Sequence, residues 1–132
     1  MRVGLVFLFA MLPLTAEDIR CPDRISTTQS LAGAIAGWTA EDGATPTILA
    51  SVTFFDGPPK QLASLVPDES HSQSATWQLV SNHGQYWLAC GYSGTRITLA
   101  RPLPAGTKTC TVTYDPKQTV DGLASIERIT CK

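Results

Sequence analysis

The segment Lys108-Thr109-Cys110-Thr111-Val112-Thr113-Tyr114 decides the fold class. Cys110, Val112 and Tyr114 alternate with threonines without a break. Such a period of two is typical of a half-buried antiparallel strand, because successive side chains of a strand point to opposite faces. We therefore predict a strand here, with the cysteine, the valine and the tyrosine facing the core.

The segment Tyr86–Tyr92 (YWLACGY) shows the same period, with its even-numbered residues on one face. Trp87 then lies on the opposite face: it is exposed if that face is wet, and it is core if a second sheet covers it. Segments rich in β-branched and aromatic residues predict further strands at 18–22, 47–55, 75–81, 95–100 and 125–131.

Two of these segments predict particular inward faces. The side chains expected to face the core in them are Ile48, Ala50, Val52, Phe54, Ile97 and Leu99. Ser93-Gly94 predicts a tight hairpin, and residues 115–124 predict a connection to the last strand. Residues 30–38 contain two glycines, which weaken a helix, so we expect a loop or short turn there. The pattern predicts an all-β fold, a small antiparallel sandwich or barrel of six to seven strands.

The first 16 residues predict a signal peptide. A charged start at Arg2 precedes the apolar run Val3–Leu14, and Ala16 supplies a small residue at the cut. A membrane anchor is the alternative, but the run is shorter than the roughly 18–20 residues that a spanning helix needs. We therefore expect export to the periplasm, a mature chain of residues 17–132 that forms a single β domain, and no stable membrane insertion after cleavage.

The charge pattern excludes two classes of partner. The whole chain has 10 basic and 11 acidic residues, and the basic residues are spread singly along it. No basic cluster could neutralise nucleic-acid phosphates or bind an anionic membrane surface.

Four cysteines remain after signal cleavage: Cys21, Cys90, Cys110 and Cys131. An even number in an exported domain predicts two disulfides, whereas a metal site would need close pairs that this chain lacks. Three pairings are possible. We favour Cys110–Cys131, because their strands are expected to pair, and this leaves Cys21 for Cys90.

No catalytic motif is found, and no cofactor or metal is predicted. His71 and His83 each occur in a polar, turn-like stretch without a second ligand at a suitable spacing. The acidic pairs Glu41-Asp42 and Asp68-Glu69 are sequence neighbours in turns, where carboxylates are usually solvated. A non-enzymatic role is therefore expected.

The segment Asp56–Glu69 (DGPPKQLASLVPDE) is the best interaction candidate. It is too long for a simple hairpin, and its three prolines stiffen it. Leu62, Leu65 and Val66 could contact a partner, or they could fold back onto the domain.

Several motifs are similar to those of one protein family. They are 18–22 (DIRCP), 37–38 (GW), 52–59 (VTFFDGPP), 65–68 (LVPD), 86–95 (YWLACGYSGT), 101–104 (RPLP) and 110–112 (CTV). The chain resembles a family of small exported proteins of Gram-negative bacteria that is associated with type VI secretion islands. The resemblance implies periplasmic immunity proteins that neutralise L,D-transpeptidase-like, peptidoglycan-targeting effectors, and it implies no catalytic residues.

The predicted function is that of a periplasmic immunity protein or inhibitor, which binds and occludes a cell-wall-degrading effector. The predicted partner-binding residues are Asp56, Lys60, Leu65, Asp68, Glu69 and Trp87. A lysozyme inhibitor or a module that binds cell-wall glycan is the alternative, in which exposed aromatic residues would supply the affinity. An enzyme acting through the Asp68 and Glu69 carboxylates is a third.

Overall fold

The computed structural model describes residues 16–43, 46–80 and 84–132. The predicted signal peptide lies outside these residues except for Ala16, and so does His83. Within the described ranges, no helix has the length and hydropathy that a bilayer crossing requires.

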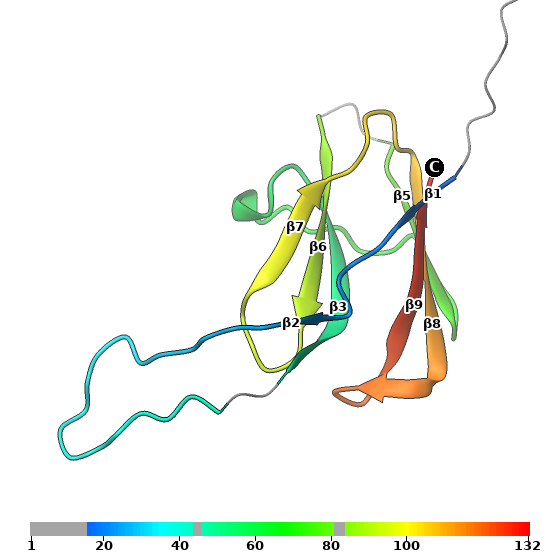
Figure 1. Cartoon of the computed structure of the whole chain (residues 1–132). Helices are drawn as coiled ribbons and strands as arrows, with labels where there is room; N and C mark the ends of the chain where they lie inside the picture. Colours follow the sequence, from blue (N-terminus) through cyan, green and yellow to red (C-terminus); the bar gives the residue numbers. More distant parts are fainter. Residues whose placement is uncertain (1–15, 44–45, 81–83) are drawn as a thin grey trace, which may run out of the picture.

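Two antiparallel sheets face each other and form a sandwich (Figure 1). One sheet has the strand order β1-β9-β8-β5-β4, and the other has the order β2-β3-β6-β7. The strands are β1 (Glu17–Ile19), β2 (Arg24–Ile25), β3 (Thr47–Asp56), β4 (Glu69–Ser70), β5 (Ser74–Gln78), β6 (Tyr86–Tyr92), β7 (Thr98–Pro102), β8 (Thr109–Val120) and β9 (Leu123–Cys131). A single turn of 3-10 helix, η1 (Pro59–Gln61), is the one helical element of the described residues. The predicted all-β, disulfide-stapled sandwich is confirmed, but the described residues form nine strands and not six to seven, because the two-residue strands β2 and β4 are too short to leave a pattern in the sequence.

Strands β6 and β8 have the predicted phase. Cys110 and Val112 are fully buried, and every even-numbered residue of β6 is buried. Tyr114 is half-buried where β8 begins to leave the core. The period of two was decisive here because both strands are central in their sheets, and one face of β6 and of the first half of β8 packs against the opposite sheet.

The predicted inward face of β3 is wrong in its first half. Leu49 is buried, whereas Ile48 is 38% exposed. The register against β6 shifts between Leu49 and Ser51. Such a bulge adds one residue to the strand and reverses which side chains face the core, so only the later residues, such as Phe54, have the predicted phase.

Ile97 and Leu99 do not contribute to the core as predicted, since they are 47% and 39% exposed. Leu99 pairs with Cys90, so its position belongs to the inward face. However, β7 is the edge strand of its sheet, and all five of its residues are exposed. The next residue with a buried side chain is Leu103, which is 1% exposed.

The predicted connection 115–124 is instead the end of a long hairpin. Strand β8 continues to Val120, which pairs with Leu123 at the start of β9. Asp121 and Gly122 form the turn, with φ angles of 54° and 79°. Two positive φ angles are typical of the type I′ hairpin turn that Asp-Gly favours.

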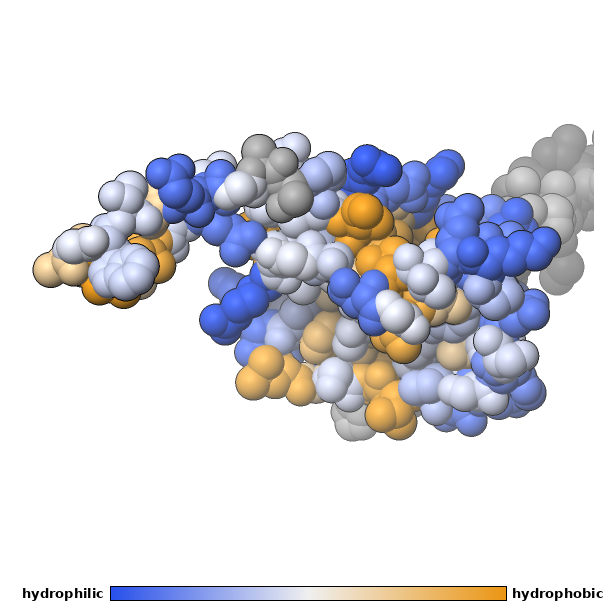
Figure 2. All heavy atoms as spheres, turned by 90° about the horizontal axis from the view of Figure 1, so that it is seen from below, coloured by the Kyte–Doolittle hydropathy of each residue, from blue (hydrophilic) through white to orange (hydrophobic). Residues whose placement is uncertain are grey.

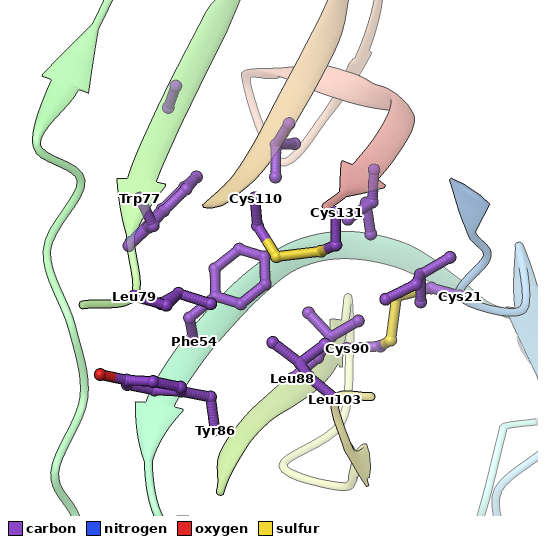
Figure 3. Close-up of a cluster of buried hydrophobic side chains, with 14 of the residues drawn as sticks. Cys21, Phe54, Trp77, Leu79, Tyr86, Leu88, Cys90, Leu103, Cys110 and Cys131 are labelled. Carbon is purple, nitrogen blue, oxygen red and sulfur yellow. A yellow bond between two sulfur atoms is a disulfide. The ribbon is translucent and has the colours of Figure 1, made fainter. Parts of the chain in front are cut away.

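The core lies between the two sheets (Figure 3). Its largest fully buried side chains are Phe54, Leu88, Leu103, Val112 and Cys110. Phe54 from one sheet contacts Trp77 from the other, with ring centroids 4.8 Å apart. Tilted aromatic pairs of this kind stabilise a core beyond the area that they bury.

Both disulfides have the pairing that we favoured. Cys110–Cys131 joins directly opposed residues of β8 and β9. Cys21–Cys90 ties the segment after β1 to β6, so it links the two sheets. The described residues contain no free cysteine.

Tyr92 anchors the same N-terminal segment. Its hydroxyl donates a hydrogen bond to the carbonyl oxygen of Pro22, with a distance of 2.8 Å. Burial, and in second place the negative charge of Asp23, raises the pKa of Tyr92 above its ordinary value. Burial also raises the pKa of Tyr114.

Residues 26–43, between β2 and β3, project from the sandwich, and we refer to them as the arm (Figures 1 and 2). Every residue from Thr28 to Gly43 is exposed. The predicted loop at 30–38 forms the far part of this arm.

Candidate partner-binding surface

Residues 57–68 connect the two sheets and form what we call the crossover segment. The segment continues from β3 into η1, and then runs back beside the end of β3 before it crosses to the other sheet. The N–H of Asp56 donates to the carbonyl oxygen of Ala63 (2.9 Å), and the N–H of Leu65 donates to that of Phe54 (2.8 Å). Phe55 and Ser64 form an isolated bridge between these two bonds. Residues 63–65 therefore pair briefly with the end of β3 and extend the four-stranded sheet.

Leu65 connects the two sheets through its backbone and side chain. Its N–H is bound to the Phe54 carbonyl, and its own carbonyl accepts a hydrogen bond from Trp77 Nε1 (3.3 Å). Its side chain packs against the core and is half-buried. Of the three apolar residues of this segment, Leu65 is the one that folds back onto the sandwich.

Asp68 fixes the second end of the crossover segment. Its N–H donates to the carbonyl oxygen of Thr76 (2.8 Å), and its Oδ2 accepts a hydrogen bond from the N–H of Gln78 (2.7 Å). Both partners belong to β5, which lies next to the short edge strand β4 of the five-stranded sheet. Asp68 thus positions the segment, and one of its carboxylate oxygens is occupied inside the molecule.

Leu62 and Val66 face solvent, with 82% and 83% of their surface exposed. Leu62 has a φ of 60°, in the left-handed region that non-glycine residues rarely adopt. The fixed ends of the crossover segment hold these two apolar side chains outside the core. Leu62 and Val66 are therefore exposed apolar side chains that a partner could cover.

An aromatic row lies beside this segment on the outer face of the four-stranded sheet. The row consists of Phe55 and Trp87, which pair across β3 and β6, and Pro102 of β7 pairs with Trp87 on its other side. Phe55 and Trp87 are half-buried, so Trp87 is neither core nor fully exposed. Phe55 was not among the predicted contact residues. The signal was present, because Phe55 must face outward once Phe54 faces the core.

The structure divides the six predicted contact residues into two groups. Asp56 lies next to the aromatic row at the end of β3, and Lys60 is exposed on η1. Asp68 and Glu69 lie at the edge of the other sheet, where Glu69 Oε2 is 3.9 Å from His71 Nε2. Leu65 bridges the groups, and the exposed surface between them belongs to Leu62 and Val66.

A separate hollow of about 580 Å³ lies where β5 ends and β6 begins. Leu79, Tyr86, Pro104 and Lys108 are among its lining residues, and none of the six predicted residues borders it. In the described part of the chain, no three His, Cys, Asp or Glu side chains gather where a metal ion could be held.

Comparison with known proteins identifies the family. No solved structure matches the chain. An uncharacterised 16.3 kDa protein of Azospirillum brasilense, encoded in the trpG 5′ region, is 30% identical over 114 residues, which cover 78% of this chain and 75% of that protein. The sequence model of the Type VI secretion system Tli immunity proteins matches residues 44–132, which include the crossover segment, the aromatic row and three of the four cysteines. The chain belongs to this family of type VI secretion immunity proteins.

Proposed function

We propose that this immunity protein acts in the periplasm, where it binds a secreted effector enzyme and covers the cleft that holds the enzyme's active site. We further propose that the effector degrades peptidoglycan. The observation on which this rests is the crossover segment, which is hydrogen-bonded to both sheets and presents Leu62 and Val66 to solvent. A segment fixed before binding loses little conformational entropy on association, and this favours tight inhibition.

The residues of this surface have different roles in the proposed complex. Leu62 and Val66 enter the effector's cleft, and the aromatic row packs against its rim. Lys60 and Glu69 are exposed charges that would set the orientation of approach. Leu65 and Asp68 are positioning residues, since their hydrogen bonds and packing are directed into the domain.

A protection assay tests the role and the target together. The product of the neighbouring gene, tested as the candidate effector, is directed to the periplasm with and without this protein, and lysis and viability are followed. Release of soluble muropeptides and release of membrane phospholipid fragments are measured in parallel. Rescue that needs the signal peptide, together with muropeptide release in unprotected cells, supports both proposals. Rescue with lipid release alone keeps the occlusion proposal and overturns the peptidoglycan target.

Matched variants test the surface. Leu62→Ser/Val66→Ser should abolish protection and weaken binding to the purified effector by about 100-fold, as expected when central apolar contacts are lost. Leu123→Ser is the control, because Leu123 is 67% exposed and lies beside the hairpin turn between β8 and β9, where it pairs with Val120 and not with the crossover segment. Equal binding by the double variant and the wild type would overturn this assignment.

Binding to cell-wall glycan is a second candidate, favoured by the half-exposed Trp87 beside Phe55. Paired aromatic side chains on a sheet face can stack on sugar rings. Retention of the protein on insoluble peptidoglycan, abolished by Trp87→Ala, would support this function. Retention that is absent in the wild type would exclude it.

A further inference from the structure

One residue, Gln29, makes the hydrogen bonds that close the base of the arm. The backbone N–H of Gln29 donates to Asp42 Oδ2 (3.0 Å), which joins the outgoing and returning halves of the arm. Gln29 Nε2 donates to the carbonyl oxygen of Gly94 (2.8 Å), which attaches the arm to the turn between β6 and β7. The direction of the arm is therefore fixed relative to the sandwich.

The end of the arm contains its own turn. The N–H of Trp38 donates to the carbonyl oxygen of Ile35 (3.1 Å), and Gly37 has a φ of 82°. Only glycine adopts this φ at little cost, so the glycine lets the chain reverse immediately before the tryptophan.

Three large apolar side chains are exposed near this turn. Leu31 is 53% exposed, Ile35 is 58% exposed and Trp38 is 80% exposed. Figure 2 shows apolar atoms gathered at the end of the arm, well away from the sandwich. The arm does not contribute to the core, so these side chains do not stabilise the domain. Exposed apolar clusters that include tryptophan are typical of protein–protein contact sites.

The charge of the arm restricts what it can contact. Residues 26–46 contain the acidic pair Glu41-Asp42 and no lysine, arginine or histidine. An acidic arm is repelled by an anionic lipid surface, which attracts basic residues instead. Its complement is an apolar pocket with basic side chains at the rim.

We propose that the arm is a second effector-binding element, which inserts Leu31, Ile35 and Trp38 into an apolar, basic-rimmed pocket of the effector. This inference rests on the proposed function and extends it. The arm lies before residues 44–132, the part of the chain that the family model matches. The contact is thus additional to any that the crossover segment makes.

The test measures binding of the purified effector to the full mature protein by calorimetry. The triple variant Leu31→Ser/Ile35→Ser/Trp38→Ser should bind about 100-fold more weakly than the wild type, while its melting temperature stays unchanged because the arm is outside the core. Leu123→Ser, the matched exposed control outside the arm, should bind within about 3-fold of the wild type.

The outcomes separate this inference from the proposed function. If the triple variant binds as tightly as the wild type, while Leu62→Ser/Val66→Ser does not, the arm inference is overturned and the proposed function stands. If the wild type does not bind the effector, both are overturned. A dimer that forms at high concentration and is lost in the triple variant would show that the arm binds a second copy, and it would overturn the inference. Binding of the wild type to anionic phospholipid vesicles, lost in the triple variant, would do the same.

A separate experiment tests the basic side chains that we propose at the rim of the effector's pocket. Glu41→Gln should lower the association rate at low salt and reduce its dependence on ionic strength, because a long-range attraction is removed. Glu127→Gln is the control, since it removes an exposed carboxylate on β9 rather than on the arm. Equal salt dependence for both variants would contradict the basic rim.

Discussion

Trp77 and Leu65 are joined by a hydrogen bond from the indole Nε1 to the leucine carbonyl oxygen, over 3.3 Å. The same indole packs on Phe54, and Phe54 in turn accepts the N–H of Leu65. These three residues form a closed set of contacts that includes both sheets and the crossover segment. The position of the exposed surface is therefore coupled to the packing of the core.

Removing this hydrogen bond should lower stability. Trp77→Phe keeps an aromatic ring against Phe54 but lacks the donor, so the free energy of unfolding should fall by about 1–2 kcal/mol. Trp77→Ala should cost about 3–5 kcal/mol, because it also opens a cavity. Urea unfolding measures both changes. Trp38→Phe is the control, since Trp38 is exposed and should leave the midpoint unchanged. Equal midpoints for the two phenylalanine variants would contradict the coupling.

The two disulfides should contribute unequally. Cys110–Cys131 closes 21 residues and Cys21–Cys90 closes 69. In the loop-entropy model, their removal lowers the free energy of unfolding by about 3 and about 4 kcal/mol. Cys21→Ser/Cys90→Ser should also speed proteolysis near residue 21, because it frees the segment between the sheets. Cys110→Ser/Cys131→Ser should not, since β9 still pairs with β8 and β1. The same cleavage pattern in both variants would contradict this difference.

Strands could be predicted from the sequence where alternation within the segment itself decides which residues face the core. The even-numbered residues of β6 alternate, and the structure buries them. The phase of β3 could not be predicted, because the bulge between Leu49 and Ser51 is a relation to β6 and not a property of the segment itself. Leu99 has the expected register, yet its burial depends on whether the other sheet reaches the edge strand. The Asp121-Gly122 turn had a local signal that we did not use.

The candidate site was predictable in extent but not in detail. The length and prolines of residues 56–69 indicated a distinct segment. Which of its apolar residues fold back was decided by distant partners, namely Phe54 and Trp77 for Leu65. The two hydrogen bonds of Asp68 to β5, one from its backbone N–H and one to its carboxylate, could not be predicted from the sequence either. The arm had no periodic pattern, so its exposed Trp38 could not be distinguished from a core residue.

Asp68 should be required for the order of the crossover segment. Asp68→Ala removes the acceptor of the Gln78 N–H, and the free energy of unfolding should fall by about 0.5–1.5 kcal/mol. Proteolysis within residues 57–68 should become faster. Asp68→Asn retains a carbonyl acceptor and should have a smaller effect. Glu69→Gln is the control, because its side chain is directed toward solvent. Unchanged proteolysis in Asp68→Ala would contradict the positioning role.

Tyr92 should make the fold sensitive to alkaline pH. Its folded pKa is raised above the unfolded value of about 10, so folding favours the neutral hydroxyl. The stabilisation that the neutral Tyr92 hydroxyl provides is fully present below the pKa of the unfolded state. It is lost as the pH rises through the pKa of the folded state. Deprotonation also removes the donor to Pro22. The urea midpoint of the wild type should therefore fall above about pH 10, and that of Tyr92→Phe should fall less. Burial raises the pKa of Tyr114 as well, so the variant Tyr114→Phe separates the contribution of that tyrosine from the contribution of Tyr92. Identical alkaline declines in all three proteins would contradict this assignment.

Leu62 should show opposite effects on stability and on effector binding. Its φ of 60° is strained for leucine, and its side chain is 82% exposed, so it contributes little to the core. Asparagine tolerates the left-handed region better, and Leu62→Asn should leave the free energy of unfolding unchanged or raise it by up to about 1 kcal/mol. If the side chain enters the effector's cleft, the same variant should bind the effector at least about 10-fold more weakly. Val66→Thr, at the neighbouring exposed position, should weaken binding without the gain in stability, because no positive φ is relieved there. Undiminished binding by Leu62→Asn would show that the strained conformation serves the fold and not the complex.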